Sequence, residues 1–194
     1  MRLRIAVSAF SLVLVSGCAW TAQQVNLRPT LAVNRVDLGQ GRPVHVEVDD
    51  ERPANALGTK VPVGGGQITP VQAPAEIISN ALIDGLGQLG FQPLRDRSNG
   101  PPTLKGELRA IDYKVAQGFW AGGLSVDVAM KAICIVESQH KYEKLYRGHH
   151  EESIQVVQSQ SANESYINDA LSQAINQVLS DRDLLQCLAT RAAP

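Results

Sequence analysis

The chain has 194 residues, with 18 Lys and Arg, 19 Asp and Glu, and 44% hydrophobic residues. That length fits a single domain, which would bury roughly 70% of the surface of its unfolded chain. A formal net charge of −1 provides no basic surface for several phosphates, so we expect no nucleic-acid partner. The hydrophobic content excludes a disordered chain, because it can offset the entropy lost on folding.

The amino terminus has the pattern of an export signal. Two arginines precede an apolar run over residues 5–15, which is shorter than the about 20 residues of a membrane-spanning helix. Residues 15–18 (VSGC) resemble the bacterial lipobox, in which a peptidase cleaves before the cysteine and the thiol receives a diacylglyceryl group. We therefore predict a signal peptide over residues 1–17, cleavage between Gly17 and Cys18, and lipidation of Cys18. An ordinary secretory signal with a chance cysteine is the alternative.

The membrane is predicted from the residue that follows the cysteine. In Gram-negative bacteria an aspartate there retains a lipoprotein in the inner membrane, and this chain has Ala19 instead. We therefore predict attachment to the periplasmic face of the outer membrane, with the inner membrane as the alternative. Acyl chains on Cys18 would anchor the protein without spanning the bilayer, so the membrane is its first expected partner.

The first half of the remaining chain is predicted to contain strands and one helix. Strands are expected over residues 30–33 and 43–48, and in the second of these valines alternate with polar residues. Prolines and glycines interrupt residues 49–73, where we expect a long excursion with a short edge strand at 67–69. A helix is predicted over residues 74–89, because it starts at a proline, is followed by a glycine and carries apolar residues at helical spacing.

The second half is predicted to contain three strands and then helices. The strands are expected over residues 103–116, 123–138 and 141–157, joined by short connections as an antiparallel meander. The apolar phase of the first strand changes near Ala110, which predicts a bulge there. A helix follows with apolar residues at helical spacing over 167–179.

Two capping sites are predicted at the carboxy-terminal helices. Ser161 and Glu164 have the spacing of a capping box for the longer helix. Asp181 can cap a final short helix that contains Leu184 and Leu188.

These elements predict an α+β fold in the order ββαβββαα. Helices segregated from strands favour a two-layer sandwich, with a mainly antiparallel sheet and the helices on one face. Residues 18–28 show no clear period and are predicted to form a lipidated tether. Residues 29–194 are then expected to form a single periplasmic domain.

Two cysteines remain beside Cys18. An oxidising periplasm permits a disulfide between Cys134 and Cys187, worth on the order of 3 to 4 kcal/mol by loop entropy. The alternative is two buried free thiols. Either way the cysteines are interpreted as structural, because neither has an adjacent histidine to activate it.

The only cluster of metal-ligating residue types is HHEE at residues 149–152. Alternation along a strand sends His149 and Glu151 to one face and their neighbours to the other, so no more than two would meet one ion. We therefore predict no metal and no cofactor, and assign no catalytic residue. A hydrolase acting on an envelope polymer, with a site around His149 and Glu151 or Asp50, is the alternative.

Two large aromatic residues stand in a glycine-flanked connection. Phe119 and Trp120 lie between two predicted strands, in a chain with only 5% aromatic residues. They are the candidate contact with an envelope partner. The alternative is that they fold back over the end of the sheet.

Several stretches together resemble one family. These are the lipobox, the strand motif V-x-V-x-V-x-D-x-R at residues 44–52 with Leu57-Gly58, the helix ending in Leu89-Gly90-Phe91, and the helix at residues 165–179. The chain resembles the YajG-type family of bacterial lipoproteins. The resemblance implies an outer-membrane lipoprotein and supplies no catalytic residue. We therefore expect a lipid-anchored periplasmic protein that serves as a non-enzymatic binding or accessory module of the cell envelope.

Overall fold

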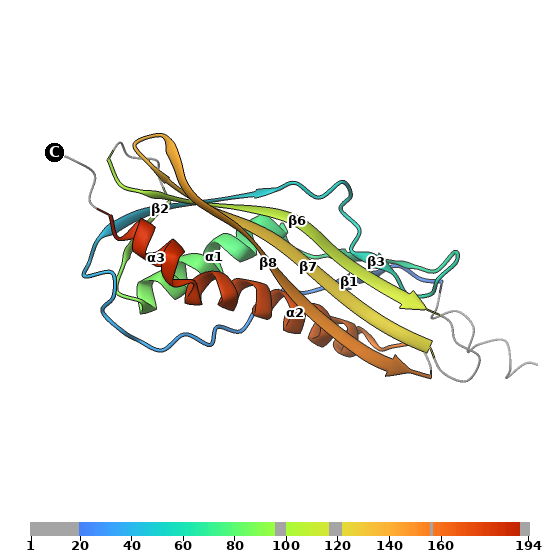
Figure 1. Cartoon of the computed structure of the whole chain (residues 1–194). Coiled ribbons are helices and arrows are strands. Elements are labelled where there is room, and N and C mark those ends of the chain that lie inside the picture. Colours follow the sequence, from blue (N-terminus) through green and yellow to red (C-terminus); the bar gives the residue numbers. More distant parts are fainter. Residues whose placement is uncertain (1–19, 96–99, 117–121, 156, 191–194) are drawn as a thin grey trace, which may run out of the picture.

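The computed structural model describes residues 20–95, 100–116, 122–155 and 157–190. Gly17, Cys18, Phe119 and Trp120 therefore lie outside the described residues. The elements in chain order are β1 (Gln23–Val25), β2 (Pro43–Asp50), β3 (Gly58–Thr59), β4 (Gln67–Pro70), α1 (Pro74–Gln88), β5 (Gln92–Leu94), β6 (Thr103–Ala116), β7 (Gly122–Val136), β8 (Gln139–Ile154), α2 (Gln160–Ser180) and α3 (Arg182–Leu188). The long strands β6, β7 and β8 run side by side and curl over the helices (Figure 1).

The sheet is mixed, which corrects part of the expected architecture. β6, β7 and β8 form the predicted antiparallel meander. However, β2 pairs in parallel with both β5 and β6, β3 pairs in parallel with β6, and β1 pairs in parallel with β4. The mainly antiparallel description is wrong for this half because β2 is followed by the crossover helix α1, and a strand after such a crossover returns in the same direction.

The predicted bulge in β6 is confirmed. The register with β7 shifts between Leu108 and Ala110. Before the bulge, Leu104 and Leu108 are buried, and after it Ile111 and Tyr113 are buried, so the change of phase keeps the apolar side chains on one face. That face is covered by the helices.

The predicted helix α1 ends at a glycine in the left-handed conformation. Gly90 has φ of 83°, its N–H donates to the carbonyl of Gly87, and the N–H of Phe91 donates to the carbonyl of Leu86. This is the Schellman pattern, which satisfies two carbonyls at the helix end. Phe91 is 5% exposed and belongs to the core.

The capping prediction for α2 is wrong in register. The N-cap is Ser159, whose side chain accepts a hydrogen bond from the N–H of Ala162. Glu164 is instead hydrogen bonded to both the backbone N–H and the side-chain amide of Asn26. The helix begins before Ser161 because Ser159 supplies the same hydroxyl two residues earlier.

The segment expected to be a tether is part of the fold from Gln23 onward. β1 pairs with β4, and Val25 is fully buried. The side chain of Asn163 in α2 accepts a hydrogen bond from the hydroxyl of Tyr113 at 2.7 Å and donates to Oε1 of Gln23 at 3.0 Å. These buried bonds join β1 to α2 and β6, so the folded domain starts before Pro29.

Residues 26–32 run along α2, and the strand expected at 30–33 does not form. Their backbone amides donate to side chains spaced four residues apart on the helix. Four helical residues advance about 6 Å and two extended residues about 6.6 Å, so the two repeats stay in step. The bonds run from the N–H groups of Asn26, Arg28, Thr30 and Ala32 to the side chains of Glu164, Asn168, Ser172 and Asn176, and the amides of Asn168 and Asn176 donate back to the carbonyls of Asn26 and Thr30.

Side chains of α2 also reach the free edge of β8. The N–H of His149 donates to Oε1 of Gln173 at 3.2 Å, and the carbonyl of Arg147 accepts from Nε2 of Gln177 at 2.7 Å. Between these two points Gly148 lies against the backbone of Ala170, where a Cβ atom would stand 1.7 Å from the carbonyl oxygen. The glycine therefore allows β8 to pack directly on α2.

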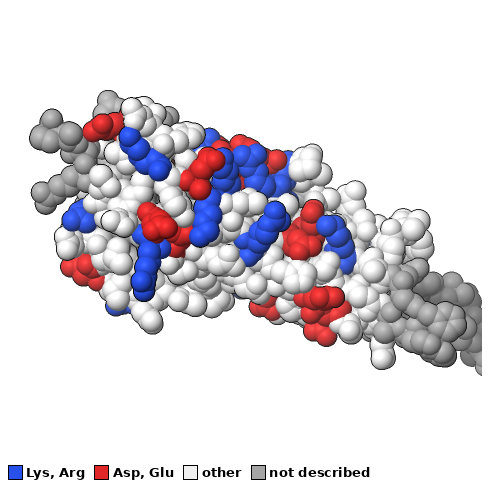
Figure 2. All heavy atoms as spheres, in the orientation of Figure 1, with Lys and Arg blue, Asp and Glu red and all other residues white. Residues whose placement is uncertain are grey.

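The sheet face away from the helices carries charged side chains. Salt bridges there join Lys105 with Asp49 at 3.1 Å and Lys131 with Glu143 at 2.7 Å, and Arg109 contacts both Glu51 and Glu107. Lys and Arg alternate with Asp and Glu over the middle of the molecule (Figure 2). These partly exposed pairs keep this face hydrated and contribute little to the free energy of unfolding.

Candidate functional site

The histidine cluster predicted at residues 149–152 is divided between two faces, as the alternation indicates. Nδ1 of His149 lies 2.8 Å from Oδ1 of Asp127, and Nε2 lies 3.7 Å from Glu151. The hydrogen bond to Asp127 raises the pKa of His149 above its ordinary value. His150 faces the other way and stacks on Tyr166 with ring centroids 4.6 Å apart. His149 is thus an exposed ion-pair partner on the charged face.

Asp50 lies far from this cluster. It accepts two hydrogen bonds from the guanidinium of Arg52, at 2.8 and 2.7 Å. β6 and β7 lie between its strand and β8, and three strand spacings amount to about 14 Å. Asp50 and His149 therefore do not form one acid and base pair. Within the described ranges, no group of three or more His, Cys, Asp or Glu residues is arranged to hold a metal ion.

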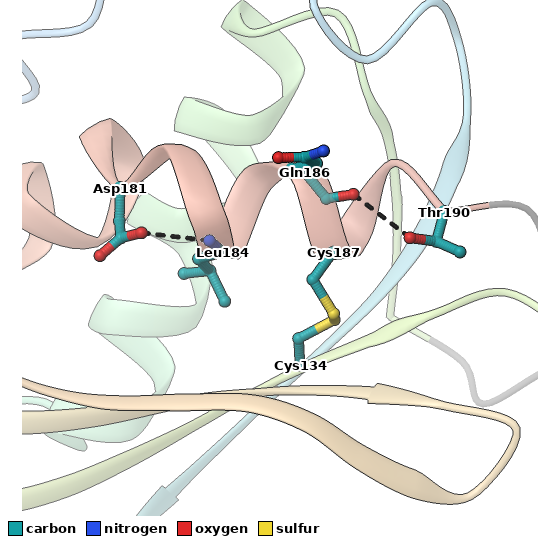
Figure 3. Close-up of a disulfide and its surroundings, with 6 residues drawn as sticks. All are labelled: Cys134, Asp181, Leu184, Gln186, Cys187 and Thr190. Carbon is teal, nitrogen blue, oxygen red and sulfur yellow. Dashed lines mark hydrogen bonds between the residues drawn. A yellow bond between two sulfur atoms is a disulfide. The ribbon is translucent and has the colours of Figure 1, made fainter.

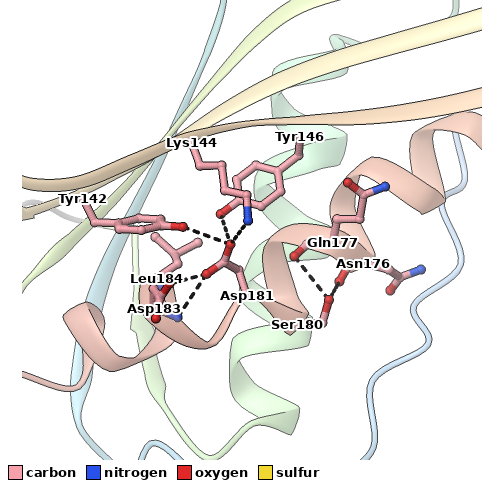
Figure 4. Close-up of polar contacts among 9 residues, drawn as sticks. All are labelled: Tyr142, Lys144, Tyr146, Asn176, Gln177, Ser180, Asp181, Asp183 and Leu184. Carbon is pink, nitrogen blue, oxygen red and sulfur yellow. Dashed lines mark hydrogen bonds and ion pairs between the residues drawn. The ribbon is translucent and has the colours of Figure 1, made fainter.

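A cluster of polar side chains gathers around Asp181 at the junction of α2 and α3. Its Oδ2 accepts hydrogen bonds from the hydroxyls of Tyr142 and Tyr146, each at 3.0 Å, and from Nζ of Lys144 at 2.7 Å (Figure 4). Its Oδ1 accepts from the N–H groups of Asp183 and Leu184, which confirms the predicted cap. The carboxylate therefore joins β8 to the start of α3.

The electrostatics of the Asp181 cluster indicate a structural role. Burial alone would raise the pKa of Asp181, but the hydrogen bonds from Lys144, Leu184 and the tyrosines lower it to about 2. Burial and the hydrogen bond to Asp181 raise the pKa values of Tyr142 and Tyr146. The hydrogen bond to Asp181 also raises the pKa of Lys144. Near neutral pH the carboxylate and ammonium stay charged and the phenols stay protonated. Such a set provides no general acid or base that titrates near pH 7.

Replacing Asp181 with Asn is expected to lower the free energy of unfolding by about 2 kcal/mol at pH 7. The pKa of about 2 lies below the ordinary value of 3.8, and this shift corresponds to about that energy. The stabilisation is complete above about pH 4 and is lost as the pH falls through about 2. Urea unfolding of both proteins between about pH 7 and 2 should show the difference shrinking in that window.

Asp183→Asn is the matched control for this prediction. Asp183 is exposed and lies two residues after Asp181, at the first turn of α3. Asp183 bonds to Asp181 through its backbone N–H, which asparagine keeps, so its replacement should lower the free energy of unfolding by less than the Asp181 exchange does. An Asp181→Asn protein with the same pH profile as the wild type would contradict the assignment.

Cys134 and Cys187 form a disulfide in the structure. It joins β7 to α3 with the Cα atoms 6.4 Å apart (Figure 3). Cys134 is directly opposite Tyr142 in the β7–β8 register, so the disulfide and the Asp181 cluster hold the same short helix. A cavity of about 360 Å³ opens beside them and is lined by Val136, Lys141, Tyr142, Asp183, Gln186, Cys187 and Thr190.

The sequence predicts the cap at Asp181 but not the partners of this residue on β8. Tyr142, Lys144 and Tyr146 are spaced two residues apart, and this spacing places them on one face of a strand. Their common acceptor lies 35 residues or more along the chain, so no local pattern connects them.

The model of an uncharacterized lipoprotein family, Lipoprotein_16, matches residues 29–189. No curated protein matches the chain.

Among solved structures, the chain is similar to protein XCC0632 from Xanthomonas campestris, with 11% identity, coverage of 86% of this chain and 93% of that one, and a TM-score of 0.48. It is also similar to a putative lipoprotein from Caulobacter crescentus, with 13% identity, coverage of 80% and 95%, and a TM-score of 0.40. Within the part of the chain that the structure describes, no helix is long and apolar enough to cross a membrane. Because the family model spans most of the sequence, the chain belongs to this family of uncharacterized lipoproteins.

Proposed function

We propose that the chain is a lipid-anchored lipoprotein of the YajG type, attached through Cys18 to the periplasmic face of the outer membrane. The lipobox sequence at residues 15–18 carries this proposal, and the lipoprotein family match supports it. Ala19 after the cysteine favours the outer membrane over the inner one.

We further propose that the domain acts as a non-enzymatic binding or accessory module of the envelope. The residues that a hydrolase would use are not brought together, which supports this proposal. His149 pairs with Asp127, Asp50 pairs with Arg52, and the two pairs lie on different strands. Phe119 and Trp120 remain the proposed partner contact. The strands they connect end at Ala116 and begin at Gly122, so the contact would form at that end of the sheet.

Exchange of Cys18 for Ser is expected to abolish labelling of the protein by a palmitate analogue. The serine hydroxyl does not accept the diacylglyceryl group that the thiol would carry, so processing and anchoring stop together. The measurement is gel detection of the label in cells that express either form, followed by separation of inner and outer membranes.

The double exchange of Cys134 and Cys187 for Ala is the control, because it removes the other two cysteines and should leave the label in place. Label that persists in the Cys18→Ser protein would contradict lipidation. Label recovered with the inner membrane would contradict the outer-membrane assignment alone.

A further inference from the structure

At one end of the molecule the described segments carry no charged side chains. β6 ends there and β7 begins there, and β8, which runs parallel to β6, also ends there. β3 runs in the same direction, so its connection to β4 turns at this end. The described segments that reach it, residues 20–27, 61–75, 153–155 and 157–163, contain no Asp, Glu, Lys or Arg. We call residues 20–22, 61–66 and 157–159 the uncharged end.

The charge distribution on the surface follows this division. In Figure 2 the coloured Lys, Arg, Asp and Glu spheres cover the left and middle of this face, and the described spheres toward the right of the view are white. The lysine that borders the uncharged end, Lys60, is 8% exposed, and its Nζ lies 3.4 Å from Oγ1 of Thr21. Few charges would therefore lose water if this end met an apolar or interfacial phase.

The uncharged end also exposes large apolar side chains. Trp20 is 62% exposed, Val63 is 82% exposed and Val157 is 41% exposed. The ring of Trp20 lies over Gly64, where a Cβ atom would stand 2.8 Å from it, so Trp20 and the β3–β4 connection present one surface. An exposed apolar group of this kind is typical of a surface that contacts a partner or a membrane.

We infer that the uncharged end rests on the surface of the phospholipid bilayer. This inference depends on the proposed lipidation of Cys18. Trp20 follows Cys18 by two residues, which span at most about 7 Å when extended. The head-group layer is itself about 5 to 7 Å thick, so Trp20 lies within or directly above it. Tryptophan is enriched at that depth, where its ring is apolar and its N–H remains hydrated.

The contact fixes how the domain stands on the membrane. β8 ends and α2 begins at the uncharged end, and α3 lies toward the opposite end of the molecule (Figure 1). β8 has 16 residues, which span about 50 Å as a strand. The disulfide and the Asp181 cluster therefore face away from the bilayer that holds the anchor.

Tryptophan fluorescence in vesicles tests the contact directly. The chain has two tryptophans, so Trp120→Phe leaves Trp20 alone. The lipidated protein that starts at Cys18, purified from cells, is reconstituted into phosphatidylcholine vesicles with or without a nitroxide-labelled phospholipid whose label lies near the head group. We expect the nitroxide to reduce Trp20 emission by about twofold or more.

A matched control moves the fluorophore away from the proposed contact. The variant Trp20→Phe, Trp120→Phe, Leu145→Trp places the single tryptophan at Leu145, an exposed position on β8 opposite Lys131. Its emission should not change with the nitroxide. The inference would be overturned if Trp20 emission were equal with and without nitroxide, in protein that carries the palmitate label and floats with the vesicles. The uncharged end would then contact a protein partner or a second copy of the chain. Protein that neither carries the label nor floats would instead overturn the lipidation of Cys18, and this inference with it.

Discussion

Loss of the disulfide between Cys134 and Cys187 lowers the free energy of unfolding by about 4 kcal/mol. The two cysteines are 53 residues apart, and a crosslink over that separation removes about this much loop entropy from the unfolded chain. For a domain of this size the loss corresponds to a fall in Tm of roughly 8 to 16 °C. Thermal unfolding with and without a reductant measures it.

The variant with both cysteines replaced by alanine supplies the control for the reductant. Its Tm should match that of the reduced wild type and should not respond to reductant, because no disulfide remains. A wild-type Tm that is the same under both conditions would contradict the bond or its contribution. Exchange of Cys187 alone would leave the fully buried Cys134 as an unpaired thiol in the core, so the double exchange is the better comparison.

Gly148→Ala is expected to destabilise the domain by about 3 kcal/mol. The added methyl group would lie 1.7 Å from the carbonyl oxygen of Ala170, and backbone atoms of a strand and a helix cannot both move aside without loss of packing. Urea unfolding should show a lower midpoint for the variant. The effect comes from close packing of β8 on α2, since Gly148 is not among the residues with positive φ.

Gly123→Ala is the matched control on the neighbouring strand β7. A Cβ atom at Gly123 meets nothing within 4 Å, and its φ is not in the left-handed region. This exchange should change the free energy of unfolding by less than about 1 kcal/mol. Similar losses in the two variants would show that the packing of β8 on α2 does not require a glycine at residue 148.

The sequence predicted those parts of the fold that depend on local patterns. Alternation over the three long strands, the change of phase near Ala110 and the proline and glycine at the ends of α1 each act within a few residues, and each was confirmed. β1, β3 and β5 were missed because two or three residues carry too little alternation to be recognised. The parallel pairing of β2 was missed because it depends on where the chain returns after α1.

The contacts of residues 26–32 could not be predicted from their own sequence. Its first residues show no clear period and residues 30–33 were predicted as a strand, whereas its hydrogen-bond partners are side chains about 140 residues away. A signal does exist on α2, where Glu164, Asn168, Ser172 and Asn176 recur every four residues. A polar stripe at that spacing is normally interpreted as a solvated helix face, so the pattern was present without indicating its partner.

The glutamines of α2 that bond to β8 also limit the pairing of this edge strand with other molecules. A free strand edge invites pairing between neighbouring molecules, the more so at high local concentration. Gln173 and Gln177 occupy an N–H and a carbonyl at residues 149 and 147, near the middle of the sixteen-residue strand. A second strand added along this edge would first have to break these two bonds, so α2 protects β8 from edge-to-edge pairing between molecules.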